Sequence, residues 1–510
     1  MSPKIRSSLA TWAGFAAMCL GMFMAILDVQ IVATSLPDIQ GALDIPPEQM
    51  SWVQTAYLIA EVIAIPLTGL LMRALSMRWL FVIATSVFTI ASIGCAASQG
   101  FNSLIAWRVL QGFAGGTLIP AVFAAVFMLF PVHRQGLATT LAGVVAVLAP
   151  TVGPIIGGWI TSTYSWHWLF LVNVVPGILA VVVAAWLVPA AQTQLGQIRR
   201  VDWLSLLGMA LALATLEIAL KEAPSRGWLS PLVVGLLAVS VASGVGFVRR
   251  SLRHTSPVVA LRSFNDRRFT IACILSFVLG IGLFGSVYLM PVFLAFVRDH
   301  TALEIGTIML VTGVAQLVIA PIAVAFEKRV SARVLTALGF AFFAIGLGMS
   351  MFQTPRTDYD QMFWPQVVRG LAIMFCLLPP TRMALGHLTD AQVPDASGVF
   401  NLMRNLGGAI GLALIDTVIY ARGPVHAADL TARLASGDAG AASFIGIPAS
   451  LLTGGAPSPA QQAMLAPLLE KASLTMAIND AWMMMAAVTA LALICIPFAR
   501  QRAVPQNAME

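Results

Sequence analysis

Long apolar segments alternate with short polar ones along almost the whole chain. Each apolar segment approaches or exceeds about 20 residues, the length at which a helix crosses the hydrocarbon core of a bilayer. To within a few residues the segments lie at 11–36, 51–72, 79–98, 103–130, 136–162, 168–189, 203–221, 231–249, 269–297, 304–326, 333–352, 361–386, 397–420 and 478–500. The pattern predicts an all-α polytopic membrane protein with fourteen transmembrane helices.

The composition agrees with this prediction. Of 510 residues, 59% are hydrophobic and 10% are charged, and the mean hydropathy is +0.88. A soluble protein carries about 25% charged residues, so these charges are too few to cover a water-facing surface. Lys4 and Arg6 precede the first apolar segment as in a signal peptide, but that segment is too long and lacks a convincing cleavage site. We therefore predict a retained first helix.

The positions of Lys and Arg predict the orientation. An even number of helices places both termini on one side, and cytoplasmic loops are enriched in basic residues. Placing both termini in the cytoplasm assigns most of the 29 Lys and Arg residues to cytoplasmic segments, among them Arg199, Arg200 and Lys328. The formal charge of +7 then reflects membrane orientation, and no nucleic-acid partner is expected.

Cysteine and histidine give no sign of a metal or cofactor site. The five cysteines lie in apolar segments without a CxxC spacing, and the six histidines are scattered without an HExxH pattern. A disulfide framework needs paired cysteines, and a metal site needs clustered ligands. We expect no disulfide, no metal and no other cofactor.

An internal repeat is visible in the sequence. The segment "WRVLQGFAGGTLIP" (107–120) aligns with "PQVVRGLAIMFCLLPP" (365–380) when Gly112 is placed over Gly370, and the segments that follow are also similar. Parallel repeats are typical of transporters with two six-helix halves and a substrate site between them. These repeats lie eight helices apart rather than six, so two additional helices are expected between the halves.

The repeat predicts three regions. They are an N-terminal six-helix half at 1–190, two inserted helices with basic linkers at 191–262, and a C-terminal six-helix half at 263–510. The last region contains a long outer segment, 421–477, that is rich in Ala, Gly, Ser and Pro. This segment is either a flexible loop or an amphipathic hairpin that touches a periplasmic partner.

Several motifs resemble those of the major facilitator superfamily. "LIAWRVLQGFAGG" (104–116) resembles its fourth-helix arginine motif, and "APTVGPIIGG" (149–158) resembles its fifth-helix antiporter motif. "LDVQIVATSLPDI" (27–39), "WHWLFLVNVVPG" (166–177) and "MRNLGGAIG" (403–411) are similar to signatures of the fourteen-helix drug:proton antiporter branch, which includes the EmrB-like multidrug exporters. The resemblance implies the superfamily fold and proton-coupled export.

Proline and glycine are concentrated in the segment that resembles the antiporter motif. Its members are Pro150, Gly153, Pro154, Gly157 and Gly158. Inside a helix, glycine costs about 1 kcal/mol and proline about 3 kcal/mol relative to alanine, while small residues let helices pack closely. The residues themselves predict a kink and a tight helix contact. The resemblance implies, in addition, a bend that seals the inner cavity against leak.

The loop between the second and third helices resembles the gating motif of the superfamily. In "GLLMRALSMRW" (69–79) it keeps Gly69, Arg73 and Arg78, but it lacks the acid of the motif, and Ser76 occupies the second glycine position. The resemblance implies that this loop latches the inward- and outward-facing states. The departure leaves two possibilities open, a weaker charge-based latch or a latch with other partners.

Asp28, Arg108 and Glu61 are the candidates for proton coupling. Asp28 and Arg108 are predicted to lie about 12 Å and 8 Å from the outer ends of their helices. Charged residues at such depth are costly and usually pair with one another, so we predict an Asp28–Arg108 pair, direct or through water or Gln111. The pair is either a static bridge or, as the resemblance implies, linked to protons. Glu61 lies near mid-depth without a local partner and could bind a proton or a cationic substrate, or stay neutral and hydrogen-bonded.

The candidates for lining the substrate cavity are Gln111, Arg369, Arg404 and Asp416. The two arginines either bind anionic groups of a substrate or pair with Asp416 or with backbone carbonyls. Glu217 lies four residues before Lys221, so we expect the two to form a pair on the helix surface.

The predicted function is proton-coupled export of drugs or other amphipathic small molecules across a bacterial inner membrane by alternating access. Protonation of Asp28, together with Glu61, would weaken the hold on Arg108 as substrate leaves. The alternative is a dedicated exporter of one endogenous compound such as a siderophore, a lipid or a peptide. A channel needs no two-fold repeat, and the sequence contains no nucleophile elbow or Walker loop that would indicate an enzyme or direct use of ATP. The resemblance also implies a periplasmic adaptor and an outer-membrane channel as partners.

Overall fold

The computed structural model describes residues 8–194, 196, 201–254, 257–327, 329–448 and 459–498, and within these ranges the regular structure is helical. Arg199, Arg200 and Lys328, used above to predict the orientation, lie outside the described residues, as do Lys4 and Arg6. The helices are α1 (Ser8–Thr34), α2 (Leu36–Leu43), α3 (Pro47–Met50), α4 (Trp52–Ala96), α5 (Phe101–Leu129), α6 (Val132–Thr163), α7 (His167–Leu171), α8 (Val174–Leu187), α9 (Trp203–Arg226), α10 (Pro231–Arg253), η2 (Leu261–Asn265), α11 (Arg267–Phe296), α12 (Ala302–Glu327), α13 (Ala332–Met349), η3 (Ser350–Phe352), α14 (Tyr359–Leu385), α15 (Val393–Ala435), α16 (Ala439–Ile445), α17 (Pro459–Leu491) and η5 (Ala492–Phe498).

The number of membrane spans agrees with the hydrophobic pattern. Among the described residues, 13 helices are long and apolar enough to cross a membrane. The helix α4 has 45 residues with non-helical backbone angles at Ser76; at 1.5 Å per residue it would measure about 70 Å if straight. It therefore supplies two of the fourteen predicted spans, and the chain is a multi-pass membrane protein.

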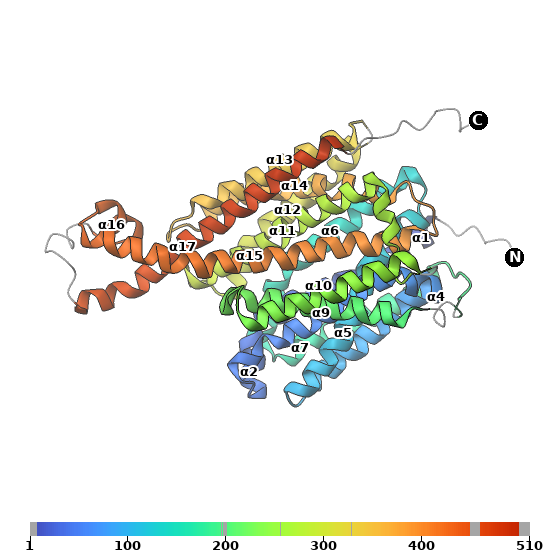
Figure 1. The fold of residues 1–510 in the computed structure, drawn as a ribbon, viewed down its shortest axis with the longest axis horizontal. Helices are drawn as coiled ribbons and strands as arrows, with labels where there is room; N and C mark the ends of the chain where they lie inside the picture. The colour runs from blue at the N-terminus through green and yellow to red at the C-terminus, as the bar shows by residue number, and fades with distance from the viewer. Residues whose placement is uncertain are drawn as a thin grey trace.

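The spans form one elongated bundle (Figure 1). The helix α1 begins and η5 ends at the same end of the bundle, which we call the proximal end, and α16 lies beyond the opposite, distal end. One large hydrophobic core is built around Phe81, Phe88 and Phe123. A second is built around Phe340, Phe343 and Trp482. The helix α4 contacts α15 and α6 contacts α12, so these two helix pairs join the two cores.

Repeat-related glycines make related contacts at these two junctions. A Cβ atom on Gly398 of α15 would lie 3.0 Å from the carbonyl oxygen of Ile65 in α4, and one on Gly136 of α6 would lie 3.0 Å from a carboxylate oxygen of Glu327 in α12. Both positions are tighter than an ordinary side-chain contact. Glycine at position 398 therefore lets α15 approach the backbone of α4, whereas the contact at Gly136 is with the end of a flexible side chain.

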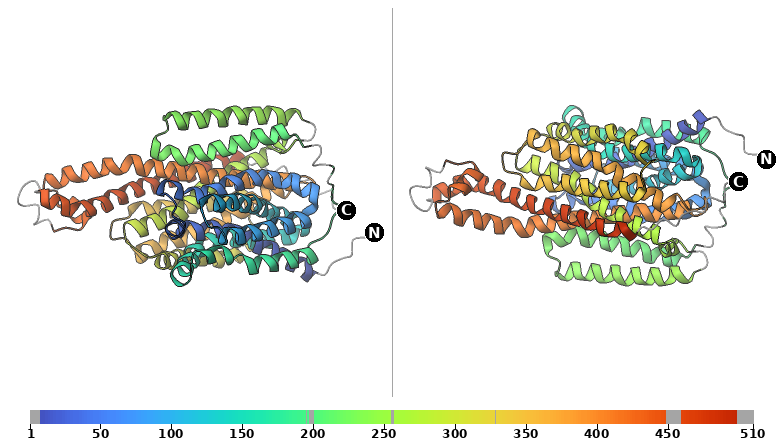
Figure 2. Two further views of the ribbon diagram at one scale, coloured as in Figure 1. Left: turned by 90° about the horizontal axis from the view of Figure 1, so that it is seen from below. Right: turned by 90° about the horizontal axis from the view of Figure 1, so that it is seen from above.

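The helices α9 and α10 form a pair on the outside of the bundle (Figure 2). The helix α9 contacts α10, α4 and α15, and Trp228, just beyond α9, donates from Nε1 to Oγ1 of Thr417 at 2.9 Å. Asp202 caps the start of α9 through Ser205 and accepts from Nε of Arg250 at 2.5 Å. The hydrogen bond from Arg250 holds the pKa of the Asp202 carboxyl well below its usual range. An ion pair therefore joins the proximal ends of α9 and α10.

The segment 421–477 is largely helical where it is described. The helix α15 continues to Ala435, α16 follows, and α17 begins at Pro459, so that a helical hairpin projects beyond the distal end (Figure 2). Of the two alternatives drawn from the sequence, the chain forms a hairpin rather than a flexible loop. The apolar segments underestimated α15 and α17 because they report membrane depth, whereas Ala, Leu and Arg sustain a helix in water as well.

The hairpin has its own small core and is joined to the bundle. The core contains Leu430, Leu434, Ala441, Ala442, Ile445 and Ala472. Asn479 of α17 donates to the carbonyl oxygen of Gln353 at 2.8 Å, and Lys471 forms an ion pair with Asp299. The hairpin is therefore held against the distal loops that follow α11 and η3.

Candidate functional site

A buried polar network surrounds Asp28 of α1. Arg108 of α5 donates from Nη1 to Asp28 Oδ2 at 2.5 Å. Gln111, one turn later on α5, and Asn173 donate to Asp28 Oδ1 at 2.9 Å and 2.8 Å. Asp28, Arg108 and Gln111 are 0% exposed. The structure thus brings the two charges predicted to pair into direct contact, with Gln111 beside them.

The helix α4 forms the wall behind Arg108. Arg108 donates from Nε to the carbonyl oxygen of Val53 at 3.0 Å, and its guanidinium carbon lies 4.4 Å from the centroid of the Tyr57 ring. The Tyr57 hydroxyl in turn donates to the carbonyl oxygen of Ala25 at 3.0 Å. A Cβ atom at Gly112 would collide with the Tyr57 backbone. Glycine at this position therefore lets α5 approach α4 closely enough to hold the guanidinium between them.

The compensation of the Asp28 charge depends on every donor remaining in place. A guanidinium and two amides satisfy the carboxylate, which offsets the cost of burying its charge. The Nη2 atom of Arg108 has no hydrogen-bond partner among the described residues. A helix movement that removes one donor from Asp28 would leave its charge poorly compensated.

Sequence reasoning missed Asn173 and Ser92 as members of this network. Asn173 lies at the break between α7 and α8, where the chain can turn its amide toward α1. The Ser92 hydroxyl of α4 accepts from Gln111 Nε2 at 2.9 Å and lies 3.4 Å from Asn173 Nδ2. The available signal was a lone amide in the quoted segment "WHWLFLVNVVPG", where an uncompensated polar side chain would be costly.

Glu61 lies one turn beyond Tyr57 on α4. It is 8% exposed, and a Cβ atom on Gly116 would lie 2.5 Å from its carbonyl oxygen, so α5 packs tightly on this turn. The Glu61 carboxylate interacts electrostatically with Asp28 and Arg108, and most strongly with Glu217 of α9. An inserted helix therefore brings a second acid close to Glu61.

The predicted Glu217–Lys221 pair is wrong. Lys221 lies 4.4 Å from the centroid of the Trp52 ring and 3.8 Å from Glu222. Glu217 Oε2 is buried without a hydrogen-bond partner among the described residues. Helical spacing places two side chains on one face, but here the packing of α9 on α4 and α15 draws Glu217 toward the bundle.

The proline- and glycine-rich segment forms part of α6. The helix runs without interruption from Val132 to Thr163 and includes both Pro150 and Pro154. A Cβ atom on Gly153 would lie 2.5 Å from Cβ of Gln30 in α1, and one on Gly158 would lie 2.6 Å from Cβ of Ala302 in α12. The small residues therefore let α6 contact both α1 and α12. Pro150, Gly153, Pro154 and Gly157 are buried in these contacts.

The gating loop reaches the start of α15. Arg73 forms an ion pair with Asp395, and a Cβ atom on Gly69 would lie 2.7 Å from Cα of Asp395. Arg78 donates from Nε to the carbonyl oxygen of Val188 at 2.6 Å. Of the two possibilities left open by the sequence, the loop uses a partner outside its own motif, an acid contributed by α15.

The backbone conformation at Ser76 shows why the motif prefers glycine at this position. Its backbone angles are φ 69° and ψ 160°, a region that glycine adopts readily and that strains other residues. The Ser76 hydroxyl is also buried without a hydrogen-bond partner among the described residues. The turn between the two spans of α4 therefore lowers the stability of this chain through backbone strain and a buried hydroxyl.

The remaining cavity candidates lie apart from the Asp28 network. Arg369 donates to Ser350 Oγ and to Met290 Sδ, each at 3.0 Å. Arg404 donates to Asn401 Oδ1 at 2.5 Å, and its guanidinium carbon lies 5.2 Å from the centroid of the Phe123 ring. Asp416 accepts from the Tyr288 hydroxyl at 2.7 Å. In the described chain, neither arginine forms an ion pair with Asp416.

Metal-binding groups are not assembled in the described part of the chain, because no three His, Cys, Asp or Glu side chains converge there. The free cysteines are dispersed as well: Cys19, Cys95, Cys273 and Cys376 are buried and Cys495 is half-buried.

Comparisons with known proteins place this architecture in a family. The Major Facilitator Superfamily profile matches residues 18–412. The colistin resistance protein EmrB of Acinetobacter baumannii is 40% identical over 407 residues, which cover 80% of each chain. The multidrug export protein EmrB of Escherichia coli is 30% identical over 417 residues, which cover 81% of each chain. The human organic anion transporter MFSD10 has a TM-score of 0.59 and 12% identity over 96% of this chain and 100% of that chain, which indicates a shared fold alone. The chain belongs to the Major Facilitator Superfamily.

Proposed function

We propose that this chain exports amphipathic small molecules in exchange for protons, by alternating access between two helical halves. The observation that carries the proposal is the completely buried Asp28–Arg108 pair, whose carboxylate depends on donors from separate elements. The names of two relatives, the colistin resistance protein EmrB and the multidrug export protein EmrB, support the same activity.

Asp28 is the proposed proton acceptor. Arg108, Gln111 and Asn173 all donate to its carboxylate in this structure, and together they offset the cost of burying its charge. When α1 moves relative to α5 or to the α7–α8 break, a donor is withdrawn and a proton replaces it. The neutral acid then holds Arg108 less strongly, which lowers the cost of rearranging the halves. Glu61 is the second proposed proton site, because its carboxylate is buried and interacts with the charge of Glu217.

The two halves are proposed as residues 1–190 and 263–510, with the inserted helices between them in the sequence. The Arg73–Asp395 pair joins α4 to α15 at the proximal end, and Ser397 donates to the carbonyl oxygen of Pro120 at 2.8 Å near the same junction. We assign this set of contacts as the latch that keeps the proximal end closed. Opening that end requires the latch to break.

The proposed location is a bacterial inner membrane with the proximal end in the cytoplasm. Arg249, Arg250, Arg267 and Arg268 lie at the proximal ends of α10 and α11, in agreement with the enrichment of basic residues on the cytoplasmic side. The helical hairpin of α15, α16 and α17 then projects into the periplasm. Its reach supports contact with a periplasmic adaptor and, through it, with an outer-membrane channel.

Transport in proteoliposomes under an imposed pH gradient tests the proposal. The panel contains cationic, neutral and anionic amphipathic compounds, and the variants are Asp28→Asn and Asp38→Asn. The second is a matched control, because Asp38 is exposed on α2 and undergoes the same chemical change. We expect Asp28→Asn to abolish proton-driven transport and Asp38→Asn to retain it. Full proton-driven transport by Asp28→Asn would contradict the proposal.

A further inference from the structure

Arg369 of α14 is a buried cation without a carboxylate beside it. It is 2% exposed, and its polar partners are the Ser350 hydroxyl and the Met290 sulfur, each at 3.0 Å. Its guanidinium carbon lies 4.7 Å from the centroid of the Trp482 ring. A thioether is only a weak acceptor, and a buried charge is costly unless it is paired and hydrogen-bonded. Among the described residues, Arg369 therefore has fewer and weaker acceptors than its charge demands.

In the N-terminal half, the buried Arg108 has a carboxylate beside it, in contrast to Arg369. Asp28 lies six residues before the end of α1 at Thr34, and Met290 lies six residues before the end of α11 at Phe296. The first accepts from Arg108 and the second from Arg369. At corresponding depths, one half pairs its arginine with a carboxylate and the other pairs it with a thioether. The second arginine is left able to accept an anion from outside the chain.

A cavity of about 230 Å³ lies against Arg369 at the distal end. Its polar wall includes Ser350, Thr357 and Gln361, and its apolar wall includes Met349 and Phe352. The Gln361 oxygen accepts from the Asp358 backbone N–H at 2.9 Å, so the amide N–H groups of Gln361 remain available as donors. Drug-sized pockets measure about 300–1,000 Å³, so this volume suits one polar end of a larger ligand.

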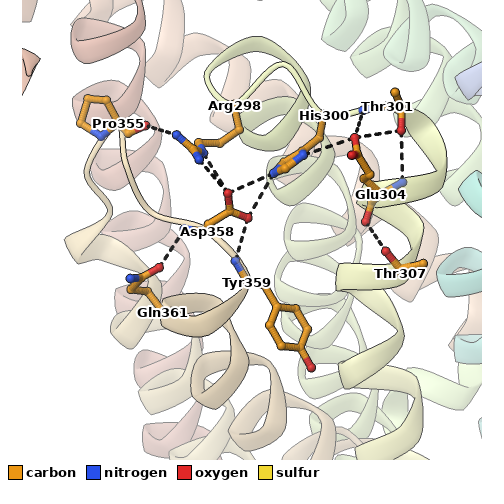
Figure 3. Close-up of polar contacts among 9 residues, drawn as sticks. All are labelled: Arg298, His300, Thr301, Glu304, Thr307, Pro355, Asp358, Tyr359 and Gln361. Atoms are coloured by element: carbon orange, nitrogen blue, oxygen red, sulfur yellow. Dashed lines mark hydrogen bonds and ion pairs between the residues drawn. The ribbon is translucent and has the colours of Figure 1, made fainter.

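Asp358 and Asp360 are the acids nearest in sequence to this wall; Asp360 is exposed, and Asp358 is already occupied. Figure 3 shows Asp358 pointing toward Arg298 and His300, on the loop between α11 and α12. Arg298 donates to Asp358 Oδ2 at 2.7 Å, and Nε2 of His300 lies 3.1 Å from Oδ1. Tyr359 N–H donates to the same Oδ1 at 2.8 Å. These contacts direct the carboxylate to another loop, so it does not neutralise Arg369.

Two further features favour an anionic ligand at this position. Arg356 is exposed and lines the cavity, where its positive charge attracts anions. A second, smaller cavity of about 20 Å³ shares Arg369 and Met290 and is also lined by Thr151 of α6. Arg369 thus lines both the distal cavity and the smaller cavity beside α6.

We propose that the distal cavity binds the carboxylate of an amphipathic organic acid, with Arg369 as its counter-charge and Ser350 and Gln361 as additional donors. A guanidinium matches the planar geometry of a carboxylate, and the flexible Met349 adapts to different apolar bodies. The ligand carboxylate takes the place of the Met290 sulfur as the acceptor. The role of this site in export rests on the proposed function, whereas binding itself does not.

Calorimetric titration of the purified full chain in detergent tests the site without any transport. The probes are 1-naphthaleneacetic acid at neutral pH and its uncharged amide, which differ in the acidic group alone. Charge-assisted hydrogen bonds contribute about 1.5–3 kcal/mol, so we expect the acid to bind roughly 10- to 100-fold more tightly than the amide. Arg369→Gln should remove this preference, and Arg369→Lys should restore part of it.

Arg226→Gln is the matched control. Arg226 is more than half exposed and pairs with Glu222 on α9, away from the cavity, so the preference for the acid should persist. Equal affinity for acid and amide, no binding of the acid to the unmodified chain, or an acid preference retained in Arg369→Gln would overturn the proposal. Acid-selective binding without transport in the pH-gradient experiment would contradict the proposed function and leave this site standing. Proton-driven transport without acid-selective binding would do the reverse.

Discussion

The Asp28–Arg108 pair provides a quantitative prediction about stability as well as transport. Asp28→Asn keeps the shape of the side chain but replaces one acceptor oxygen with a donor NH₂ group. In the present network Oδ2 accepts from Arg108 while Oδ1 accepts from Gln111 and Asn173. The amide oxygen can replace only one of these acceptors, and Arg108 keeps its full charge in a completely buried position.

The expected cost follows from this geometry. Removing one partner of a buried ion pair costs about 3–5 kcal/mol, because the other charge is left uncompensated. Arg108→Gln should cost a similar amount for the same reason. The double variant removes both charges and leaves amides that can hydrogen-bond with each other. Its cost should therefore fall at least about 2 kcal/mol below the sum of the single costs.

Equilibrium unfolding in mixed detergent and SDS micelles, followed by circular dichroism, measures these free energies. The four proteins of the cycle are the unmodified chain, the two single variants and the double variant. Asp38→Asn serves as the exposed control and should change the unfolding free energy by less than about 0.5 kcal/mol. The double variant should be more stable than the sum of the single costs predicts and yet inactive in proton-driven transport.

Two results would refute this reasoning. Single variants within about 1 kcal/mol of the unmodified chain would mean that the charges are compensated by groups other than each other. Additive single costs in the double variant would mean that the two residues do not interact, despite their contact. A stable double variant with full proton-driven transport would leave the pair as a structural bridge.

Three further predictions concern the proximal turn and the distal loops. Arg73→Gln leaves Asp395 unpaired and should shift the equilibrium toward an open proximal end by about 1–3 kcal/mol; spin-label distances between the proximal ends of α4 and α15 measure this, and an unchanged distribution would contradict it. Ser76→Gly relieves backbone strain and should raise the unfolding free energy by about 1 kcal/mol, whereas Ser76→Ala should not, as chemical denaturation can determine. Although burial opposes it, hydrogen bonding from Arg298 and its neighbours lowers the pKa of Asp358. The Asp358 contribution is therefore present above the unfolded pKa of about 4 and is lost as pH falls through the folded pKa. The unmodified chain should exceed Asp358→Asn in stability by about 1 kcal/mol at pH 7, and an advantage that does not shrink on acidification below about pH 4 would argue against this assignment.

The membrane fold followed from the hydrophobic pattern because a bilayer imposes one strong condition. Backbone groups in lipid must be satisfied within the segment that carries them, so each sufficiently long apolar run becomes a helix. The turn at Ser76 separated two predicted spans that the helix α4 joins, and it was visible as a polar interruption between apolar runs. The ends of α15 and α17 escaped prediction because a helix can continue into water after the apolar run stops.

Part of the site could also be predicted, because an isolated charge in lipid is costly enough to require a partner. That argument linked Asp28 to Arg108 from their depths alone. It failed for Glu217, whose spacing from Lys221 suited a surface pair while the packing of α9 drew it toward Glu61. Depth is encoded along the sequence, but the rotation of one helix against another is set by contacts between distant segments.

The sequence by itself determined the number of spans, the family resemblance and the residues whose charge had to be compensated in the membrane. The tertiary structure decided how each was compensated. Asn173 joins Asp28 because the break between α7 and α8 faces α1, and Asp395 joins Arg73 because glycines let α15 approach α4. Within the part of the chain that the structure describes, Arg369 has no such acid, because α11 presents Met290 to it. The local sequence pattern shows which buried charges need a partner. Only the packing of the helices decides which side chain pairs with each of them.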